Sequence, residues 1–119
     1  GDGGAVIWAQ RIGLTRAKEY LLTGDLLSAQ KAAEIGLVNH CVPLEELDAK
    51  VDAFCEKLLK GATVAIRATK ILTNLELKRV ATALMDAGIA YESVSVRSAD
   101  HMEGIQALKE KRKPKFTGR

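Results

Sequence analysis

The spacing of hydrophobic positions predicts helices over most of the chain. The clearest stripe lies between residues 44 and 60, where apolar residues recur every three or four positions, as on one face of a helix. Its members are Leu44, Leu47, Val51, Phe54 and Leu58. The same spacing predicts one helix near residues 63–72 and a longer one near residues 77–94. A last helix is expected to begin at Ser98 and to end before Pro114, whose ring prevents further extension.

Small polar residues and glycines mark the limits of the earlier helices. Asp2 is a candidate N-cap for a helix near residues 3–12, and Thr15 is a candidate N-cap for the next one. Ser28 is expected to open a third helix, which ends at Gly36 because glycine readily adopts the left-handed turn.

One segment has the composition of a strand. Residues 37–42 are rich in β-favouring residues and are bounded by Gly36 and Pro43. We therefore expect one short strand near residues 38–42 in an otherwise helical chain.

The composition of the 119 residues is that of an ordinary folded domain. Hydrophobic residues make up 47% and charged residues 28%, which excludes wholesale disorder. No apolar run reaches the about 18 residues that a membrane-spanning helix needs, so no membrane partner is expected. Cys41 and Cys55 are too few for a disulfide framework. Their hydrophobic neighbours predict reduced, buried thiols in a cytoplasmic protein.

Positive charge is concentrated at the C-terminal end. The net charge is +3, but residues 109–119 hold six basic residues against the single acidic Glu110. Such a cluster suits a solvated helix end that favours the helix dipole, a site for a small anionic ligand, or a nucleic-acid surface. Nucleic acid is the least favoured of the three, because the sequence lacks interleaved aromatic residues and a wider basic face.

No local pattern names a reaction. The turn Gly1-Asp2-Gly3-Gly4 leads into a helix, and its free backbone N–H groups suit an anion, a carbonyl oxygen or a water molecule, or serve structure alone. It matches neither a P-loop nor a dinucleotide fingerprint. No metal site is expected, because the cysteines and histidines lack zinc spacing; these are His40, Cys41, Cys55 and His101. The acidic residues near position 45 are interpreted as a solvated helix face.

The order of the sequence motifs along the chain resembles that of the crotonase superfamily, that is, the enoyl-CoA hydratase/isomerase family. Four segments carry this resemblance, and together they span essentially the whole chain. They are Gly1-Asp2-Gly3-Gly4, Leu22-Thr23-Gly24 with Ser28-Ala29, Gly36-Leu37-Val38, and Glu103-Gly104 with Glu110-Lys111-Arg112-Lys113-Pro114.

The resemblance implies a parent fold in the α/β class, a crotonase-like spiral of ββα units. In that fold residues 1–42 form the last part of the spiral core. Residues 43–119 form the C-terminal helical region, which covers the active site and makes trimer contacts. A homo-trimer or hexamer is therefore the expected assembly, and the chain is expected to be the C-terminal part of a longer protein.

The resemblance also implies an enzyme that acts on an acyl-CoA thioester through an enolate held in an oxyanion hole. Hydration of a 2-enoyl-CoA is the expected reaction. Double-bond isomerisation or another acyl-CoA reaction of the family is an alternative, and a non-catalytic helical assembly or anion-binding module is an alternative of another class. No separate cofactor is expected, since coenzyme A is part of the substrate.

Site residues are carried over only where the motifs match. The catalytic glutamates and the oxyanion donors precede the Gly1–Gly4 turn in the family, so no catalytic residue is assigned here and residues 1–119 alone are expected to be inactive. Gly1 corresponds to a position beside the catalytic water. Lys111 corresponds to a lysine that approaches the CoA nucleotide, and Leu108 stands where an aromatic residue often assists. Asp2 lies one place after the acid of some isomerases and is given no role.

Overall fold

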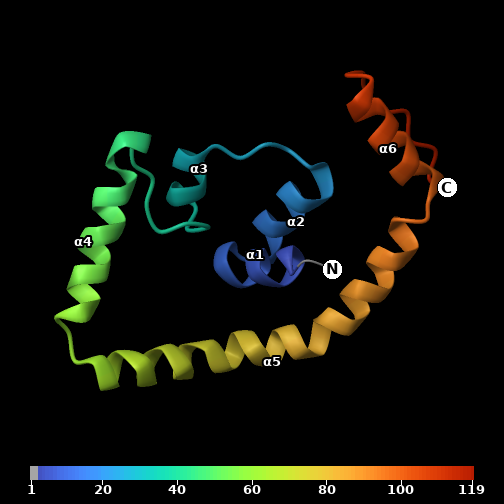
Figure 1. The fold of residues 1–119 in the computed structure, drawn as a ribbon. Helices are drawn as coiled ribbons and strands as arrows, with labels where there is room; N and C mark the ends of the chain where they lie inside the picture. Colours follow the sequence, from blue (N-terminus) through green and yellow to red (C-terminus); the bar gives the residue numbers. More distant parts are fainter. Residues whose placement is uncertain (1–2) are drawn as a thin grey trace. The chain divides into compact units, whose positions relative to one another are not determined.

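The computed structural model describes residues 3–119, which form helices joined by short connections (Figure 1). In chain order these are α1 (Gly4–Ile12), α2 (Leu14–Thr23), α3 (Ala29–Glu34), the 3-10 helix η1 (Leu44–Glu46), α4 (Leu47–Leu59), α5 (Thr63–Ser95) and α6 (Ala99–Lys109). The chain divides into two compact units, one made by residues 4–81 and the other containing residues 82–119. The mostly helical prediction is confirmed. Gly1 and Asp2 lie outside the described residues, and the predicted division at residue 42 stays a prediction.

Helices α1 and α2 pack against each other in the first unit. Val6 and Ile12 of α1 are buried, and so is Ala17 of α2. The rings of Trp8 and Tyr20 meet edge to face, with their centroids 6.3 Å apart, an arrangement that the charge distribution of aromatic rings favours. This helical pair contributes three of the buried apolar side chains that the first unit contains.

Glycines lie at both limits of α2. The predicted N-cap Thr15 is wrong, because α2 begins at Leu14 and the Ala17 N–H already bonds to the carbonyl of Gly13 at 3.1 Å. Gly24 ends the helix with a φ of 71°, and its N–H bonds to the carbonyl of Tyr20 at 2.9 Å. A positive φ of this kind is what glycine adopts without steric cost.

The predicted limits of α3 are confirmed, but the predicted strand after it is wrong. The Ser28 hydroxyl accepts a hydrogen bond from the Lys31 N–H at 3.1 Å, as an N-cap does. The N–H groups of Leu37 and Val38 both bond back to the carbonyl of Ala32, at 2.8 and 3.2 Å. These donors close the helix end and are not free for a sheet ladder. Residues 38–42 are therefore irregular, and residues 3–119 contain no strand.

The two helices predicted near residues 63–72 and 77–94 are one continuous helix, α5. No glycine or proline separates the two apolar stripes, so nothing in the sequence forces the helix to stop. The Thr73 hydroxyl donates a hydrogen bond to the backbone carbonyl of Thr69 at 2.9 Å. The Arg79 guanidinium forms an ion pair with the carboxylate of Glu76, one turn earlier, at 2.7 Å. Both contacts are compatible with an uninterrupted helix.

The apolar stripe of α4 is exposed. Leu47, Val51, Phe54 and Leu58 have between 42% and 53% of their surface accessible. Cys55 of the same helix is also exposed and Cys41 is half-buried, so the prediction of buried thiols is wrong for Cys55. Residues of the segment before α4, among them Asn39 and Val42, line an open pocket with this side of the helix but leave Cys55 and the stripe accessible. None of the helices in residues 3–119 has the length and hydropathy needed to cross a membrane.

Helix α6 of the second unit has the predicted N-cap. The Ser98 hydroxyl accepts the N–H of His101 at 3.1 Å and donates to the carbonyl of Ser95 at 2.7 Å. It thus satisfies a backbone donor at the start of α6 and links that start to the end of α5.

Replacing Ser98 by alanine is expected to destabilise α6 by about 1 kcal/mol, because it removes the cap acceptor. Amide hydrogen exchange in residues 99–104 measures this effect. Ser98→Asp retains an acceptor and is the matched control. Equal exchange in Ser98→Ala and the unchanged protein would contradict the capping role.

Candidate anion-binding site at the end of α6

Helix α6 ends in a tight turn in which Lys111 occupies a position that normally belongs to glycine. The Lys111 N–H bonds to the carbonyl of Leu108 at 3.2 Å, and the Arg112 N–H bonds to the carbonyl of Ala107 at 3.0 Å. These two bonds are those of a Schellman motif, whose turning residue is left-handed. Lys111 has a φ of 53°, and it is the one non-glycine residue with positive φ among residues 3–119.

This conformation is unfavourable for a residue with a side chain. The left-handed region costs an L-residue about 1–2 kcal/mol, because Cβ approaches the following carbonyl oxygen. Such a residue persists where its surroundings hold it, and strained residues of this kind cluster at functional sites. The position of Lys111 therefore calls for contacts on either side that hold the turn.

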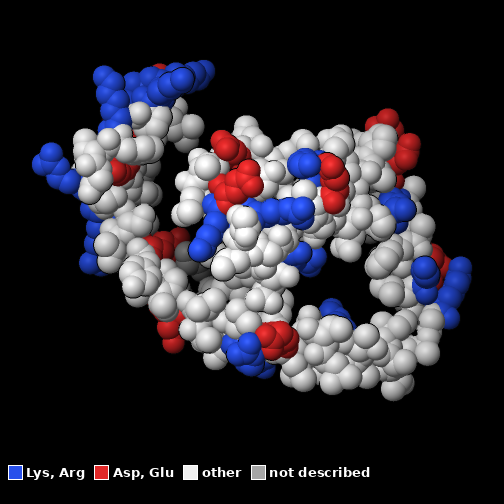
Figure 2. Space-filling model, turned by 180° about the vertical axis from the view of Figure 1, so that it is seen from behind, with Lys and Arg blue, Asp and Glu red and all other residues white. Residues whose placement is uncertain are grey.

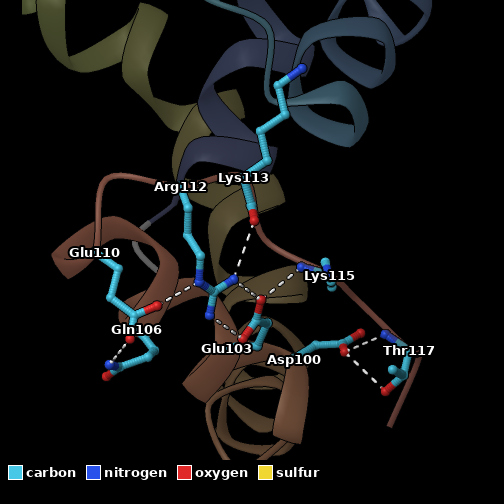
Figure 3. A network of polar contacts seen from close by, with 8 residues as sticks. All are labelled: Asp100, Glu103, Gln106, Glu110, Arg112, Lys113, Lys115 and Thr117. Atoms are coloured by element: carbon cyan, nitrogen blue, oxygen red, sulfur yellow. Dashed lines mark hydrogen bonds and ion pairs between the residues drawn. The ribbon is translucent and has the colours of Figure 1, made fainter.

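Arg112 provides the contact that immediately follows the turn (Figure 3). Its guanidinium forms a two-pronged pair with Glu103, in which Nη2 lies 2.9 Å from Oε2 and Nη1 contacts Oε1. Its Nε donates to the carboxylate of Glu110, and Nη1 also donates to the carbonyl of Lys113 at 3.2 Å. One arginine side chain thus connects α6, the turn and the segment that follows.

The carboxylates in the first two turns of α6 bind the backbone of the C-terminal segment. Glu103 accepts the N–H of Lys115 at 2.7 Å. Asp100 accepts the N–H groups of Thr117 and Gly118 at 2.7 and 2.8 Å, and its own N–H donates to the carbonyl of Arg119 at 3.0 Å. Residues 113–119, named here the tail segment, are therefore folded back along α6 (Figure 3).

These contacts keep the carboxylates ionised. Hydrogen bonds from Arg112 and then from the Lys115 N–H lower the pKa of Glu103 to about 2. The N–H groups of Thr117 and Gly118 lower the pKa of Asp100. A carboxylate whose pKa is lowered by folding stabilises the fold above its unfolded pKa, and this contribution is lost as the pH falls through the folded pKa. The Glu103 contacts are therefore complete at neutral pH and weaken between about pH 4.5 and pH 2.

The network neutralises Arg112 and leaves lysines available. Figure 2 shows Lys and Arg side chains gathered at the end of α6 and in the residues that follow it. Within the described part of the chain, the ammonium groups of Lys111, Lys113 and Lys115 form no ion pair. In Figure 3 the side chain of Lys113 points away from the network. Ammonium groups of this kind are point-charge partners for phosphate.

An open, mostly apolar pocket of about 550 Å³ lies on the same unit. Leu108 and Ile105 of α6 line it together with Phe116 of the tail segment. The Phe116 ring packs close to Gly104, since a Cβ on that glycine would lie 3.8 Å from the ring edge. Leu108 is 81% exposed, so an apolar surface borders the basic helix end.

The structure thus places two of the predicted site residues at one end of α6. Lys111 forms the turn, and Leu108 both accepts the hydrogen bond that closes it and lines the pocket. Gly1 lies outside the described residues. Sequence reasoning missed the roles of Asp100, Glu103 and Phe116, whose contacts span nine or more residues. The available signal was Pro114, which excludes a helix that continues beyond it.

Residues 3–119 contain no group of histidine, cysteine, aspartate or glutamate side chains arranged to hold a metal ion. The arrangement at the end of α6 can instead bind an anion through lysines, next to an apolar surface.

Comparisons with known proteins agree over the full chain. The family model described as "Enoyl-CoA hydratase/isomerase" matches residues 1–119. The human protein named "Enoyl-CoA hydratase domain-containing protein 2, mitochondrial" is 34% identical, over 100% of this chain and 42% of the relative. A Streptococcus mutans protein named "Trans-2-decenoyl-[acyl-carrier-protein] isomerase" is 31% identical, over 98% of this chain and 44% of the relative.

A solved structure is similar as well. The crystal structure of an enoyl-CoA hydratase from Bacillus anthracis has a TM-score of 0.62 at 38% identity, and the match covers 100% of this chain and 46% of that one. The chain therefore spans less than half the length of the relatives it matches here.

Proposed function

The chain belongs to the enoyl-CoA hydratase/isomerase family, and from this premise we propose that the whole protein acts on acyl-CoA thioesters, with hydration of a 2-enoyl-CoA as its reaction. The crotonase-like fold and the mostly helical character of this segment agree with the family. In this proposal the end of α6 binds the nucleotide part of coenzyme A, whose phosphates match the free lysines in charge.

The observation that carries the proposal for this chain is the left-handed Lys111. Glycine would form the same turn at lower cost, so a lysine here indicates that its side chain has a use. Leu108 adds an apolar surface on which a nucleoside can rest, beside the positive charge.

Isomerisation of the double bond is the competing reaction. One similar protein is named as an isomerase of an acyl-carrier-protein thioester, and one oxyanion hole serves several reactions of an enolate. Measuring both products from a 2-enoyl-CoA and a 3-enoyl-CoA decides between them. We further propose a homo-trimer or hexamer and a cytoplasmic location, although the human relative is named as mitochondrial.

In the whole protein, Lys111→Glu is expected to raise the KM for crotonyl-CoA about tenfold and to change kcat less than about twofold. One charge-assisted contact contributes about 1.5 kcal/mol, which is close to a factor of ten in binding. The nucleotide is remote from the reacting double bond, so the loss falls on KM. Loss of the enoyl absorbance follows the reaction, and higher salt should raise KM for the unchanged protein too.

Two controls separate binding from folding. Crotonyl-pantetheine lacks the nucleotide, so its KM should not respond to Lys111→Glu. Lys111→Gly removes the charge but suits the turn, and it should leave the free energy of unfolding unchanged or raise it by up to about 1 kcal/mol while still raising KM. An unchanged KM for crotonyl-CoA in both variants would overturn the nucleotide contact.

The alternative of another class is a non-catalytic assembly or anion-binding module. It predicts no turnover of any enoyl-CoA by the whole protein, even where coenzyme A binds. Turnover by the purified whole protein would exclude that alternative.

A further inference from the structure

We propose that Asp100 and Glu103 are positioning residues, which bind the tail segment back onto α6 and thereby hold Lys111 in place for the anionic part of the substrate. This inference rests on the proposed function, because it concerns the same site. Neither carboxylate is assigned a contact with the substrate.

The argument begins with the strain at Lys111. A left-handed lysine is held only if the residues on both sides are fixed. On the helical side, the Schellman bonds to Leu108 and Ala107 fix the turn. On the other side, Arg112 is fixed by its two-pronged pair with Glu103 and by Glu110. Removing Glu103 leaves the far side of the turn with the weaker of these two restraints.

The tail segment depends on the same carboxylates. Pro114 has no N–H group, and the N–H groups of Lys115, Thr117 and Gly118 bond to Glu103 or to Asp100. These bonds lie on both sides of Phe116 and hold its ring at the pocket that Leu108 also lines. Without them the tail segment has little to order it, because each free residue gains conformational entropy.

Order in the unbound protein has a direct effect on affinity. A ligand that must first order a mobile segment binds more weakly than one that meets a pre-organised site. The carboxylates therefore affect substrate binding although Lys111 makes the contact. The negative charge of the two carboxylates repels an anionic ligand, so neutralising them should by electrostatics alone raise the affinity. A loss of affinity in the neutral variants therefore requires another cause, which is the loss of order in the tail segment.

The experiment uses the whole protein with Glu103→Gln and Asp100→Asn, each assayed with crotonyl-CoA and with crotonyl-pantetheine at pH 7. We expect a threefold to tenfold rise in KM for crotonyl-CoA, an unchanged kcat, and no change with crotonyl-pantetheine. Amide hydrogen exchange at Lys115, Thr117 and Gly118 should become faster in the same variants.

Glu76→Gln is the matched control. Glu76 also forms a two-pronged, exposed pair with an arginine, Arg79, at 2.7 and 2.8 Å, but this pair lies within α5 and holds no other segment. Its KM values should stay unchanged. Ending the chain after Phe116 provides a second test that leaves α6 intact, because it removes the partners of Asp100, and it should raise KM for crotonyl-CoA in the same direction.

Three results would overturn the inference. One is an unchanged KM for crotonyl-CoA in both carboxylate variants and in the shortened chain. Another is an equal rise in KM for crotonyl-CoA and for crotonyl-pantetheine, or a fall in kcat, either of which would indicate general structural damage. The third is a lack of effect of Lys111→Glu, which would remove the proposed nucleotide contact itself. A response to Lys111→Glu without a response to the carboxylate variants would leave the proposed function standing and reject only the positioning role.

Discussion

Residues 1–119 produced alone are expected to associate, or to unfold without a sharp transition, because the chain buries very few large side chains. The buried apolar residues among those described are Val6, Ile12, Ala17, Ala32 and Ala107. Three of these five are alanines, which bury little surface. Large apolar side chains, in contrast, are exposed along α4 and α5, and exposed apolar patches of this kind lead to association.

The accessible surface area shows how much less surface this chain buries than a compact protein of its mass. The chain exposes 9909 Å². A compact protein of its mass, 12.8 kDa, exposes about 6,300 Å², and two separate compact bodies of half that mass expose about 7,600 Å² together. A cooperative transition needs a core, and this surface leaves little material for one.

Analytical ultracentrifugation and a thermal scan measure this prediction. Phe54→Gln is expected to weaken association without lowering the helix content, because Phe54 is 53% exposed and contributes little to any core. Glu56→Gln, on the same helix, is the control and should not weaken association. A monomer with one sharp unfolding transition would contradict the prediction.

Local signals in the sequence predicted several local features correctly, although the predicted N-cap at Thr15 was wrong. Ser28 and Ser98 are N-caps as predicted, because a capping hydroxyl bonds to an N–H only three residues away. The left-handed turn at Gly36 follows in the same way from one residue. Each of these features is decided within one helical turn, so the sequence contains all the information that it requires.

Features that depend on distant partners were not predictable. The strand expected near residues 38–42 had a suitable composition, but a strand needs a partner, and here the donors of Leu37 and Val38 close α3 instead. The ties from Asp100 to Thr117 and Gly118 join residues 17 and 18 apart. An acidic residue in the first turn of a helix, such as Asp100, favours the helix dipole without any partner, so its position in the sequence does not indicate these ties.

The candidate site shows the same division. Lys111 and Leu108 came from the resemblance of the C-terminal segment to a family. The left-handed conformation of Lys111 could not be predicted from the sequence, because lysine shows no preference for a positive φ. The pair between Arg112 and Glu103, which we propose holds this turn, joins residues nine positions apart, so no local pattern in the sequence indicates it.

Residues 1–119 alone are also expected to give no measurable hydration of crotonyl-CoA. A general base works best when its pKa lies near the working pH. The described carboxylates with a resolved pKa shift all have a lowered pKa, because arginine, glutamine or backbone donors hold them ionised; these are Glu76, Asp100, Glu103 and Glu110. Glu103, with a pKa of about 2, is a weak base at pH 7 and carries no proton to donate.

The loss is expected to be large, because both catalytic glutamates and both oxyanion donors are expected, from the family resemblance alone, to precede the Gly1–Gly4 turn. Each oxyanion donor lowers the activation barrier by about 2.7–4 kcal/mol, and acid–base catalysis raises the rate by a further factor of about 10²–10⁴. A spectrophotometric assay of residues 1–119 at high protein concentration, beside the whole protein in the same buffer, measures the difference. Weak binding of coenzyme A by residues 1–119, reduced by salt and by Lys111→Glu, is compatible with this prediction. Turnover of crotonyl-CoA by residues 1–119 above the rate in buffer would refute it.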